Sequence, residues 1–306
     1  MATQTPVMVT GAGGLIGHSL VRQLRSAGRS VLAVDRVPAA ANAGLDVSIA
    51  ELSDIHRINA LAAAGIDGII HCGGISGPML GRDHPAGMVA VNVGGTVNLL
   101  EAARLFAARR FVFCSSIVAY GATPAGQEVV DESAPLTATD MYGASKAAAD
   151  LLVRAYAGQH GVDARVGRIG WVYGPRRRTP SVVGRLLRAA LAGTPLTLED
   201  DGSYPLQLVH VDDVVTALIA LYDADGAAGR AFNITAGVQT PLAELASTIA
   251  AIVPGAEFRF TPGQSMSDVA QGRFNVAALY GLGWRPALGL TDGIAAYADW
   301  LSENPY

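Results

Sequence analysis

The sequence predicts an α/β fold in which a doubly wound parallel sheet is followed by a smaller C-terminal α/β lobe. Short apolar segments alternate with longer, alanine-rich amphipathic segments through the first half of the chain, and a glycine-rich turn joins the first apolar segment to the first amphipathic one. This alternation is typical of β-α-β units stacked on a parallel sheet. After about Pro175 the pattern becomes less regular, which indicates a second, smaller unit.

The apolar segments are predicted to be the strands of the sheet, over residues 6–10, 30–35, 68–72, 110–115 and 163–169. The amphipathic segments are predicted to be helices, over residues 14–26, 55–64, 84–107 and 141–160. Asp46 and Val47 mark a further brief strand. Each helix then connects two parallel strands, as the right-handed β-α-β unit requires.

The later part of the chain contains helix patterns over residues 181–192, 213–222, 241–251 and 290–302, with short extended segments around 196–198 and 206–211. These elements fit a lobe that closes over the carboxyl ends of the strands, where open α/β sheets bind their ligands. We therefore expect a larger domain over residues 1–175 and a substrate-binding lobe over residues 176–306. The chain is expected to cross between them more than once.

Composition excludes several function classes. The chain has 306 residues, with 22 basic and 26 acidic side chains and a formal net charge of −4, which is too balanced to indicate a nucleic-acid partner. No apolar run approaches the roughly 20 residues that cross a bilayer, and no cleavable leader is evident, so we expect a cytoplasmic protein without a membrane partner. The two cysteines form neither a disulfide framework nor a metal-binding spacing, so no metal is expected.

The glycine-rich turn predicts a Rossmann-type dinucleotide site. Gly11, Gly14 and Gly17 follow the first strand and open the first helix, and Leu15 and Ile16 lie within the same turn. Glycines in this context let the backbone turn sharply and approach a pyrophosphate, to which the helix N-terminus offers free N–H groups.

Asp35 predicts which dinucleotide binds. It ends the second strand, where a carboxylate can accept hydrogen bonds from the ribose diol of an adenosine and would repel a 2′-phosphate. Arg36 beside it could receive such a phosphate, so NADP remains an alternative. We expect NAD as the cofactor of the domain over residues 1–175.

Three residues suggest the chemistry. Tyr142 and Lys146 lie four residues apart on a predicted helix and therefore project from one face, so the ammonium can favour ionisation of the phenol. Ser116 follows the fourth main strand and can deliver a hydroxyl to the same region. Together they predict acid/base catalysis of hydride transfer at a carbinol carbon, with Tyr142 as the base and Ser116 orienting the reacting oxygen.

Two other polar positions are interpreted structurally. His71, at the end of an apolar strand, is expected to be a satisfied buried imidazole. Asp212 immediately precedes an apolar helix and is expected to cap its free N–H groups rather than to act with His210 as a catalytic pair.

The chain contains further short motifs in a fixed order, over residues 10–17, 71–74, 91–96, 115–121, 142–146, 172–176 and 210–213. On these motifs it resembles, over nearly its whole length, the extended short-chain dehydrogenase/reductases, the NAD-dependent epimerase/dehydratase group. This resemblance implies an enzyme of carbohydrate metabolism with Ser116, rather than Ser115, as the catalytic hydroxyl. It also implies a homodimer formed through the helices around residues 92–106 and 142–160.

The resemblance assigns further cofactor contacts. Lys146 would hold the nicotinamide ribose together with its role beside Tyr142. The remaining positions carried over are Asp46 and Val47 bordering the adenine, Cys72, Gly73 and Gly74 between pyrophosphate and nicotinamide ribose, Asn92 supporting the same region, and Gly170 beside the nicotinamide.

Departures from the family pattern concern the substrate. Leu206 stands where nucleotide-sugar members usually have an arginine for the substrate diphosphate, and Trp171 stands where an asparagine is usual. Losing a guanidinium removes charge-assisted hydrogen bonds of about 1.5 to 3 kcal/mol each. Candidate substrate residues are Ser76, in a glycine-rich loop, Trp171, and Arg176, which could bind a carboxylate or phosphate.

Three functions remain open on the sequence. The first is an oxidoreductase that acts on a small sugar-like or sugar-acid substrate without a nucleotide. The second is an NAD-dependent sugar epimerase, with or without a nucleotide on the sugar, in which the hydride returns to the opposite face. The third is a non-catalytic module that senses dinucleotides, against which the intact set of Ser116, Tyr142 and Lys146 argues.

Overall fold

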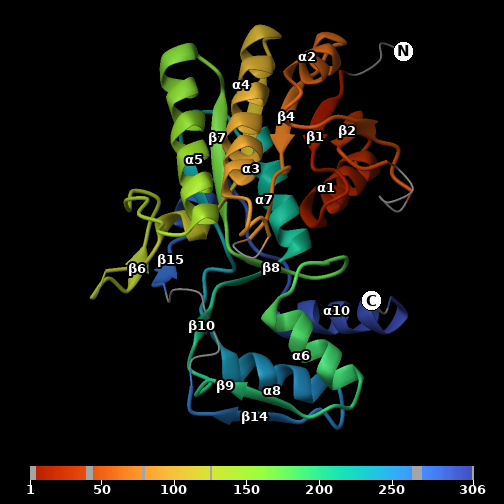
Figure 1. The fold of residues 1–306 in the computed structure, drawn as a ribbon, viewed down its shortest axis with the longest axis vertical. Coiled ribbons are helices and arrows are strands. Elements are labelled where there is room, and N and C mark those ends of the chain that lie inside the picture. The colour runs from red at the N-terminus through yellow and green to blue at the C-terminus, as the bar shows by residue number, and fades with distance from the viewer. Residues whose placement is uncertain (1–4, 39–43, 78–79, 125, 264–270, 305–306) are drawn as a thin grey trace.

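The computed structural model describes residues 5–38, 44–77, 80–124, 126–263 and 271–304. Within these ranges the larger domain is built on a seven-stranded sheet in the order β12-β7-β5-β4-β1-β2-β3, with every neighbouring pair parallel (Figure 1). The strands are β1 (Val7–Thr10), β2 (Val31–Asp35), β3 (Ser48–Ile49), β4 (Gly68–His71), β5 (Arg110–Ser116), β7 (Ala164–Ile169) and β12 (Ala231–Ile234).

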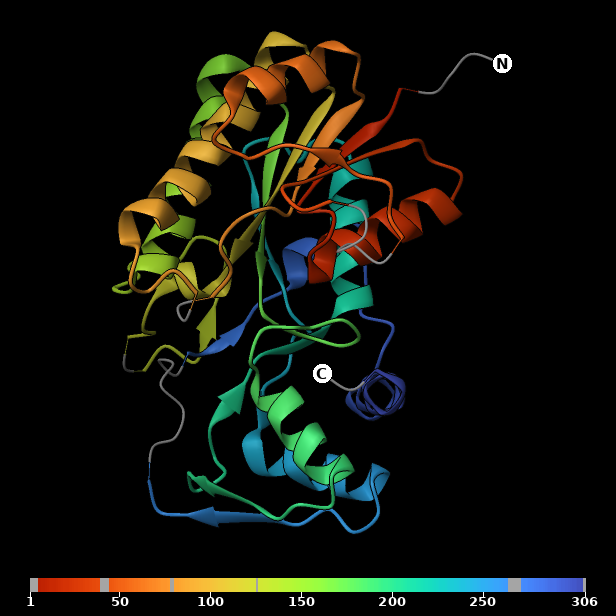
Figure 2. The same cartoon turned by 45° about the vertical axis from the view of Figure 1, so that its right-hand side comes forward.

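Helices cover both faces of this sheet (Figure 2). One face packs against α2 (Ile55–Ala63), α4 (Gly95–Leu105) and α5 (Met141–His160), and the other against α1 (Leu15–Ser26) and α7 (Val211–Asp223). Strand β5 contains consecutive apolar residues because both of its faces are buried. Phe111 and Phe113 enter the core on the α4/α5 face, whereas Val112 and Cys114 enter the core on the α1/α7 face. A strand that is buried on both faces has no polar alternation.

The predicted doubly wound fold is confirmed, with local differences. The predicted helix over residues 84–107 is divided into α3 (Pro85–Val89), a π-helical turn (Ala90–Gly94) and α4. The brief strand expected at Asp46 and Val47 lies at Ser48–Ile49. Strand β12 was not predicted, because its four residues lie in the irregular half of the chain and carry a polar Asn233 in the middle.

The smaller lobe packs three helices against a two-stranded sheet. Its elements are α6 (Val182–Leu191), α8 (Leu242–Ile252), α10 (Leu290–Glu303), β9 (Leu196–Glu199) and β14 (Phe258–Thr261). Leu186, Leu245 and Ile294 contribute fully buried side chains to its core, one from each helix. This core is separate from the two cores of the larger domain.

The chain passes repeatedly between the two parts, as Figure 1 shows. Helix α7, strand β12 and α9 (Ala277–Tyr280) all follow residue 176 in sequence yet pack in the larger domain. Short strand pairs mark the crossings: β8 (Trp171–Tyr173) with β11 (Leu208–His210), β10 (Pro205–Leu206) with β13 (Thr240–Pro241), and β6 (Val129–Val130) with β15 (Arg273–Phe274).

The N-terminus of α7 differs from the expected cap. The side chain of His210, not of Asp212, caps the helix, and its Nδ1 accepts a hydrogen bond from the Asp212 N–H at 3.2 Å. The expectation that Asp212 is the cap is therefore wrong. The carboxylate of Asp213 instead accepts the N–H groups of Ala287 and Leu288, at 2.8 and 3.2 Å, and so fixes the segment that leads into α10.

His71 has the structural role that was predicted. Its ring nitrogens lie 2.7 Å from Thr10 Oγ1 and 3.1 Å from Thr96 Oγ1, and the side chain is buried. Burial, followed by the charge of Lys146, lowers the pKa of His71 to about 3, so the ring is neutral at ordinary pH. It thus joins β1, β4 and α4 beneath the ends of the strands.

A buried ion pair between Arg168 and Asp150 anchors helix α5 on strand β7. Arg168 on β7 donates from Nε to Asp150 of α5 at 2.8 Å, and both side chains are almost completely buried. Its other donors bind the Tyr120 hydroxyl at 2.8 Å and the Glu132 carbonyl at 2.9 Å. Asp150 also pairs with Arg154 at 2.9 Å, but the Arg154 side chain is about one-third exposed.

We expect Arg168→Met to lower the free energy of unfolding by about 3–5 kcal/mol, because it leaves the Asp150 carboxylate buried without its main partner. The matched variant Arg154→Met removes the partly exposed partner and should cost about 1 kcal/mol or less. Urea denaturation followed by circular dichroism measures both. Equal losses in the two variants would show that the buried pair does not hold α5 on the sheet.

Candidate active site

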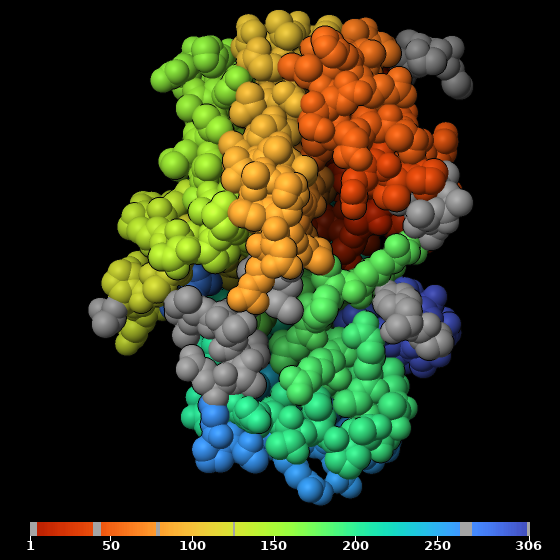
Figure 3. Space-filling view, in the orientation of Figure 1, coloured from red at the N-terminus to blue at the C-terminus, as the bar shows by residue number. Residues whose placement is uncertain are grey.

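A cleft of about 910 Å³ lies where the carboxyl ends of the strands face the smaller lobe. It is lined by the glycine turn, the end of β2, the loop after β4, the end of β5 and the segments 169–172 and 176–183. Figure 3 shows the N-terminal segment, in red, set back between the larger domain and the green segment around residue 180. This is the sheet edge at which open α/β folds bind ligands.

The glycine turn leaves no room for side chains. Gly11 has φ +67°, and a Cβ there would lie 2.7 Å from backbone atoms of Gly73. A Cβ on Gly17 would lie 2.0 Å from the Gly11 carbonyl oxygen. Helix α1 begins after Gly14 without a side-chain cap, so its first N–H groups face the cleft. This arrangement fits a dinucleotide pyrophosphate.

Asp35 lies at the far end of the cleft and is rigidly held. Its carboxylate accepts the Gly13 N–H at 2.8 Å and the Val37 N–H at 3.2 Å, and Arg36 lines the cleft beside it. Asp46 and Val47 are not among the lining residues. Residues 50–52, which follow β3 directly, occupy the wall next to Asp35, and the sequence reasoning missed them because it placed β3 two residues too early.

The loop after β4 forms the middle of the cleft. Cys72, Gly73 and Gly74 line it, and the Cys72 Sγ lies 3.4 Å from the Sγ of Cys114 on β5. Asn92 does not line the cleft but holds this loop in place. It exchanges two hydrogen bonds with the backbone of Ile75, at 2.8 and 3.1 Å. The π-helical turn that carries Asn92 is the kind of helix irregularity that often occurs at functional sites.

Helix α5 brings the three predicted catalytic residues together. Asp140 caps the helix by accepting the Gly143 N–H at 2.9 Å, and the first turns then bury Tyr142 and Lys146 against the end of β5. The Ser116 hydroxyl accepts the Val118 N–H at 3.2 Å, and Ser116 and Tyr142 both line the cleft. Lys146 Nζ donates to the Cys114 carbonyl at 2.9 Å.

The electrostatics of the phenol differ in part from the expectation. Burial is the largest effect and raises the pKa of Tyr142, while hydrogen bonds from Ser116, Ser76 and the Gly77 N–H lower it, as does the charge of Arg177. Lys146 is not among the largest of these effects, so burial, and not the neighbouring amine, has the greatest influence on the phenol in this structure. Burial likewise lowers the pKa of Lys146, which favours its neutral form.

The predicted substrate residues separate into two ends of the cleft. Ser76 contacts the Tyr142 phenol, and the Trp171 ring lies 5.9 Å from the ring of Tyr204 at the boundary with the smaller lobe. Arg176, at φ +72°, lies near α1, where its charge helps burial to lower the pKa of His18 to about 4. Arg177, which the sequence favoured less than Arg176 for a substrate role, is the arginine whose charge acts on Tyr142.

Leu206 occupies the place of the usual arginine as part of a hydrophobic core. Its side chain is fully buried in the core of the smaller lobe, and its backbone pairs with Thr240 in the β10–β13 ladder. Gly170 lines the cleft, where a Cβ would lie 2.7 Å from the Gln207 carbonyl oxygen. Neither position offers a side-chain donor to a ligand.

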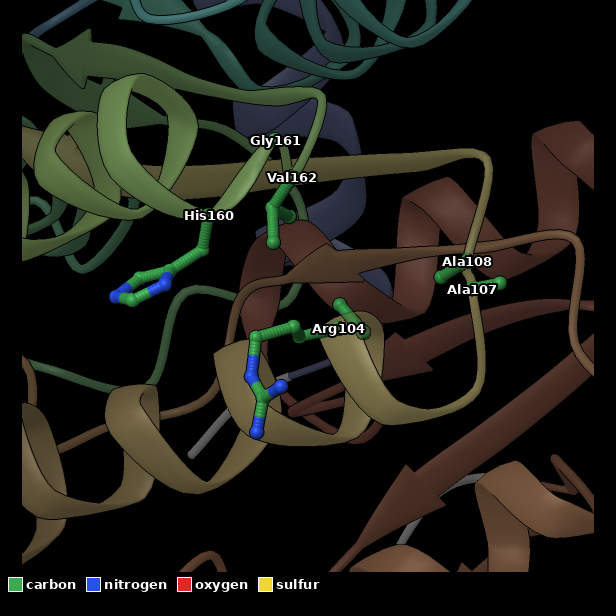
Figure 4. A pocket seen from close by; sticks show the side chains of 7 residues that line it. Arg104, Ala107, Ala108, His160, Gly161 and Val162 are labelled. Atoms are coloured by element: carbon green, nitrogen blue, oxygen red, sulfur yellow. The ribbon is translucent and has the colours of Figure 1, made fainter.

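A second hollow of about 300 Å³ lies near the C-terminal ends of α4 and α5 (Figure 4). Its walls are mostly alanine and glycine, with Arg104 and His160 as the polar side chains. Arg104 is already paired with Glu101 at 2.7 Å. We assign this hollow no role in catalysis because it contains neither an activated hydroxyl nor a glycine turn.

Two further observations concern metal binding and membrane-spanning helices. In the described ranges, no group of three or more His, Cys, Asp or Glu side chains is arranged to hold a metal ion. None of the helices that these ranges contain is both long and apolar enough to span a membrane.

We expect Gly17→Ala to weaken NAD binding about 10- to 100-fold, because the added methyl group overlaps the Gly11 carbonyl and forces the turn to open at a cost of about 1–3 kcal/mol. Gly158→Ala is the control, since its added methyl group meets no atom within 4 Å. Calorimetric titration with NAD measures both. Unchanged affinity in folded Gly17→Ala protein would contradict the assignment of the turn.

Comparison with known proteins shows similar chains along the whole length. The chain is 32% identical to a UDP-glucose 4-epimerase of Mycolicibacterium smegmatis, covering 97% of this chain and 98% of that one. It is 31% identical to a dTDP-glucose 4,6-dehydratase of Streptomyces griseus, covering 98% and 95%. Its fold is similar to that of the Thermus thermophilus UDP-glucose 4-epimerase in complex with NAD, with a TM-score of 0.86, 26% identity and coverage of 98% and 100%.

The family comparison agrees with the motifs and with the geometry of the cleft. Residues 7–235 match the model of the NAD dependent epimerase/dehydratase family, which is more than half of the chain. The match includes the glycine turn, Asp35, Ser116, Tyr142 and Lys146. The chain therefore belongs to the NAD-dependent epimerase/dehydratase family, within the extended short-chain dehydrogenase/reductases, and is an NAD-dependent enzyme.

Proposed function

We propose that this enzyme oxidises a carbinol, or reduces the corresponding carbonyl, of a small sugar-like substrate that carries no nucleotide. The observation that supports this most is the convergence of the Ser116 and Ser76 hydroxyls on the phenol of Tyr142, at the end of a cleft with a dinucleotide cradle. NAD, when bound, supplies a hydride acceptor. The residues of this chain then bind the substrate and move its hydroxyl proton.

In this mechanism Tyr142 takes the proton from the reacting hydroxyl. Hydrogen bonding by Ser116, Ser76 and the Gly77 backbone lowers the pKa of Tyr142, so these groups can stabilise the phenolate while burial opposes it. Ser116 is fixed by the Val118 N–H and can direct the substrate oxygen toward Tyr142. Lys146, anchored on the Cys114 carbonyl, provides a donor on the same side of α5 for the ribose of the cofactor.

The cleft favours redox chemistry without elimination of water. In the described part of the chain, the carboxylates that line it are Asp35 and Glu51, and both belong to the adenosine end near β2 and β3. Loss of a hydroxyl from a sugar needs a second general acid besides the group acting on the carbinol. The lining residues near Tyr142 offer none, which argues against a dehydratase.

Leu206 and Trp171 support a substrate without a nucleotide. A fully buried leucine cannot donate to a diphosphate, and an indole offers a single donor in place of an amide. An epimerase remains the second candidate, because UDP-glucose 4-epimerases are among the similar proteins. In that reaction the same residues serve, but the hydride returns to the sugar and no net NADH forms.

We expect Tyr142→Phe to lower kcat roughly 100- to 10,000-fold, because the variant removes the group that accepts the proton. NAD affinity should change little. The measurement is NADH formation at 340 nm, using wild-type enzyme to identify an active substrate among aldoses, polyols, aldonates and uronates. Full turnover in a folded variant that binds NAD would exclude Tyr142 as the base.

The same assay separates the two candidate functions. A dehydrogenase accumulates NADH in proportion to substrate consumed, whereas an epimerase converts the sugar without net reduction of NAD. UDP-glucose is included with product analysis by chromatography. Conversion of UDP-glucose to an epimer, without NADH formation, would replace the proposed oxidoreductase by the epimerase.

We further propose a homodimer formed through α4 and α5. Their outer surfaces carry large apolar side chains that are about half exposed, Leu105 at 53% and Leu151 at 54%, with Met141 at 46% at the start of α5. A second copy of the chain would cover this face by forming a four-helix bundle. The helices lie side by side on the outside of the larger domain in Figure 1.

We expect Leu151→Glu to convert a dimer into monomers, because it places a charge within the apolar face. Val238→Glu is the control, since Val238 is equally exposed, at 57%, but lies in the loop before β13. Light scattering after gel filtration measures the mass. A monomeric wild-type protein, or a dimer that persists in Leu151→Glu, would contradict this interface.

A further inference from the structure

The cleft contains a guanidinium that forms no ion pair with an acidic side chain in the part of the chain that the structure describes. Arg177 lies in the loop between β8 and α6, lines the cleft, and acts electrostatically on the phenol of Tyr142. Its contacts within the described residues are to the carbonyl oxygens of Val172, Thr179 and Pro180. These acceptors orient the guanidinium, but they do not neutralise its charge.

Arg177 is partly buried, and the fully buried arginines of the described chain are paired differently. Arg110 lies 2.7 Å from Asp225, Arg168 lies 2.8 Å from Asp150, and Arg165 contacts Asp163. This protein therefore usually places a carboxylate beside a guanidinium that it buries, because an unbalanced buried charge is costly. Arg177 is different, because its hydrogen-bond partners in the described residues are backbone carbonyl oxygens and it forms no ion pair with a carboxylate there.

The hydrogen bonds of Arg177 leave donors for a ligand. A guanidinium has five N–H groups in a planar fork. Two of its three carbonyl contacts are 3.4 Å long, from Nε to Thr179 and from Nη2 to Pro180, and are therefore weak. The fork can turn these donors toward the cleft, where an anion would gain charge-assisted hydrogen bonds in a partly desolvated place.

We propose that Arg177 binds a carboxylate of the substrate, so that the enzyme acts on a sugar acid, an aldonate or a uronate, rather than on a neutral sugar. This inference rests on the proposed oxidoreductase function. One guanidinium matches the single charge of a carboxylate, and its planar donors match the two carboxylate oxygens. Lys146 is buried and held by the Cys114 carbonyl, and Arg176 and Arg178 line other parts of the same cleft.

The position of Arg177 in the cleft also determines which carbinol of a bound sugar acid lies next to Tyr142. Arg177, Ser76 and Tyr142 line the same cleft, so the anion site and the proton acceptor can contact one bound substrate. A substrate held by its carboxylate then presents a carbinol close to the acid group to Tyr142. Arg176, the adjacent residue, acts on His18 at the other end of the cleft and is not part of this subsite.

The first experiment measures steady-state kinetics with NAD and acid/neutral pairs: D-gluconate with D-glucitol, and D-glucuronate with D-glucose. We expect the acids to have the higher kcat/KM. Arg177→Met should raise the KM of the acid roughly 10- to 100-fold, whereas the KM of the neutral partner should change much less; any effect of the lost charge on Tyr142 would lower kcat for both partners alike. Arg177→Lys should restore part of the loss. Arg185→Met, on the exposed side of α6, is the matched control.

The second experiment keeps the inference testable if none of these probes is oxidised. Thermal unfolding of enzyme saturated with NADH is followed with and without D-gluconate and D-glucuronate. Stabilisation of wild-type protein by either acid that is lost in Arg177→Met supports the subsite. Absence of stabilisation by both acids in wild-type protein overturns it.

Other outcomes also decide between the two proposals. If neutral polyols produce NADH as well as the acids do, the carboxylate subsite is wrong and the oxidoreductase function stands. If Arg177→Met weakens NAD binding instead of acid binding, Arg177 serves the cofactor and the subsite is wrong. If the acids stabilise the wild-type protein through Arg177 but UDP-glucose is epimerised without net NADH, the subsite stands and the oxidoreductase function fails.

Discussion

The active site depends on how α5 packs against the end of β5. Lys146 reaches across this contact to the Cys114 carbonyl at 2.9 Å, and the Ser145 hydroxyl receives a hydrogen bond from Asn92 at 3.0 Å. Tyr142, one turn earlier on the same face of the helix, is thereby set against Ser116 at the strand end. Because the Arg168–Asp150 pair holds the middle of α5 on β7, the helix cannot slide without breaking a buried charge pair.

At the carboxyl ends of β1 and β4, the backbone atoms of two turns are packed too closely to leave room for side chains. The strands β1 and β4 end side by side, so the turns that follow them meet, and the Gly11 and Gly73 backbones come too close for a Cβ at Gly11. His71, held by Thr10 and Thr96, fixes these two strands just below the turns. A cofactor can therefore lie directly on peptide N–H groups.

The sequence was most informative where local rules decide the structure. Strand and helix periodicity, the glycine turn, and the spacing of Tyr142 and Lys146 depend on residues close together in the chain. The five longer predicted strands begin and end within about one residue of those observed. Strand β12 was missed because its partner β7 lies more than 60 residues earlier, and nothing local identifies the pair. The cap of α7 was misassigned because His210 and Asp212 can both accept N–H groups, and tertiary packing selects between them. The ionisation of Tyr142 could not be predicted from spacing, because burial outweighs a neighbouring charge.

Arg176 and Arg177 are adjacent in the sequence but act on different residues, His18 and Tyr142. Arg176 adopts φ +72°, a left-handed conformation that is uncommon for residues other than glycine and that turns the chain sharply between two long side chains. Arg176 therefore acts on His18 beside the glycine turn, while Arg177 acts on Tyr142 at the reacting end. The left-handed turn at Arg176 thus lets two consecutive arginines act on residues in different parts of the site.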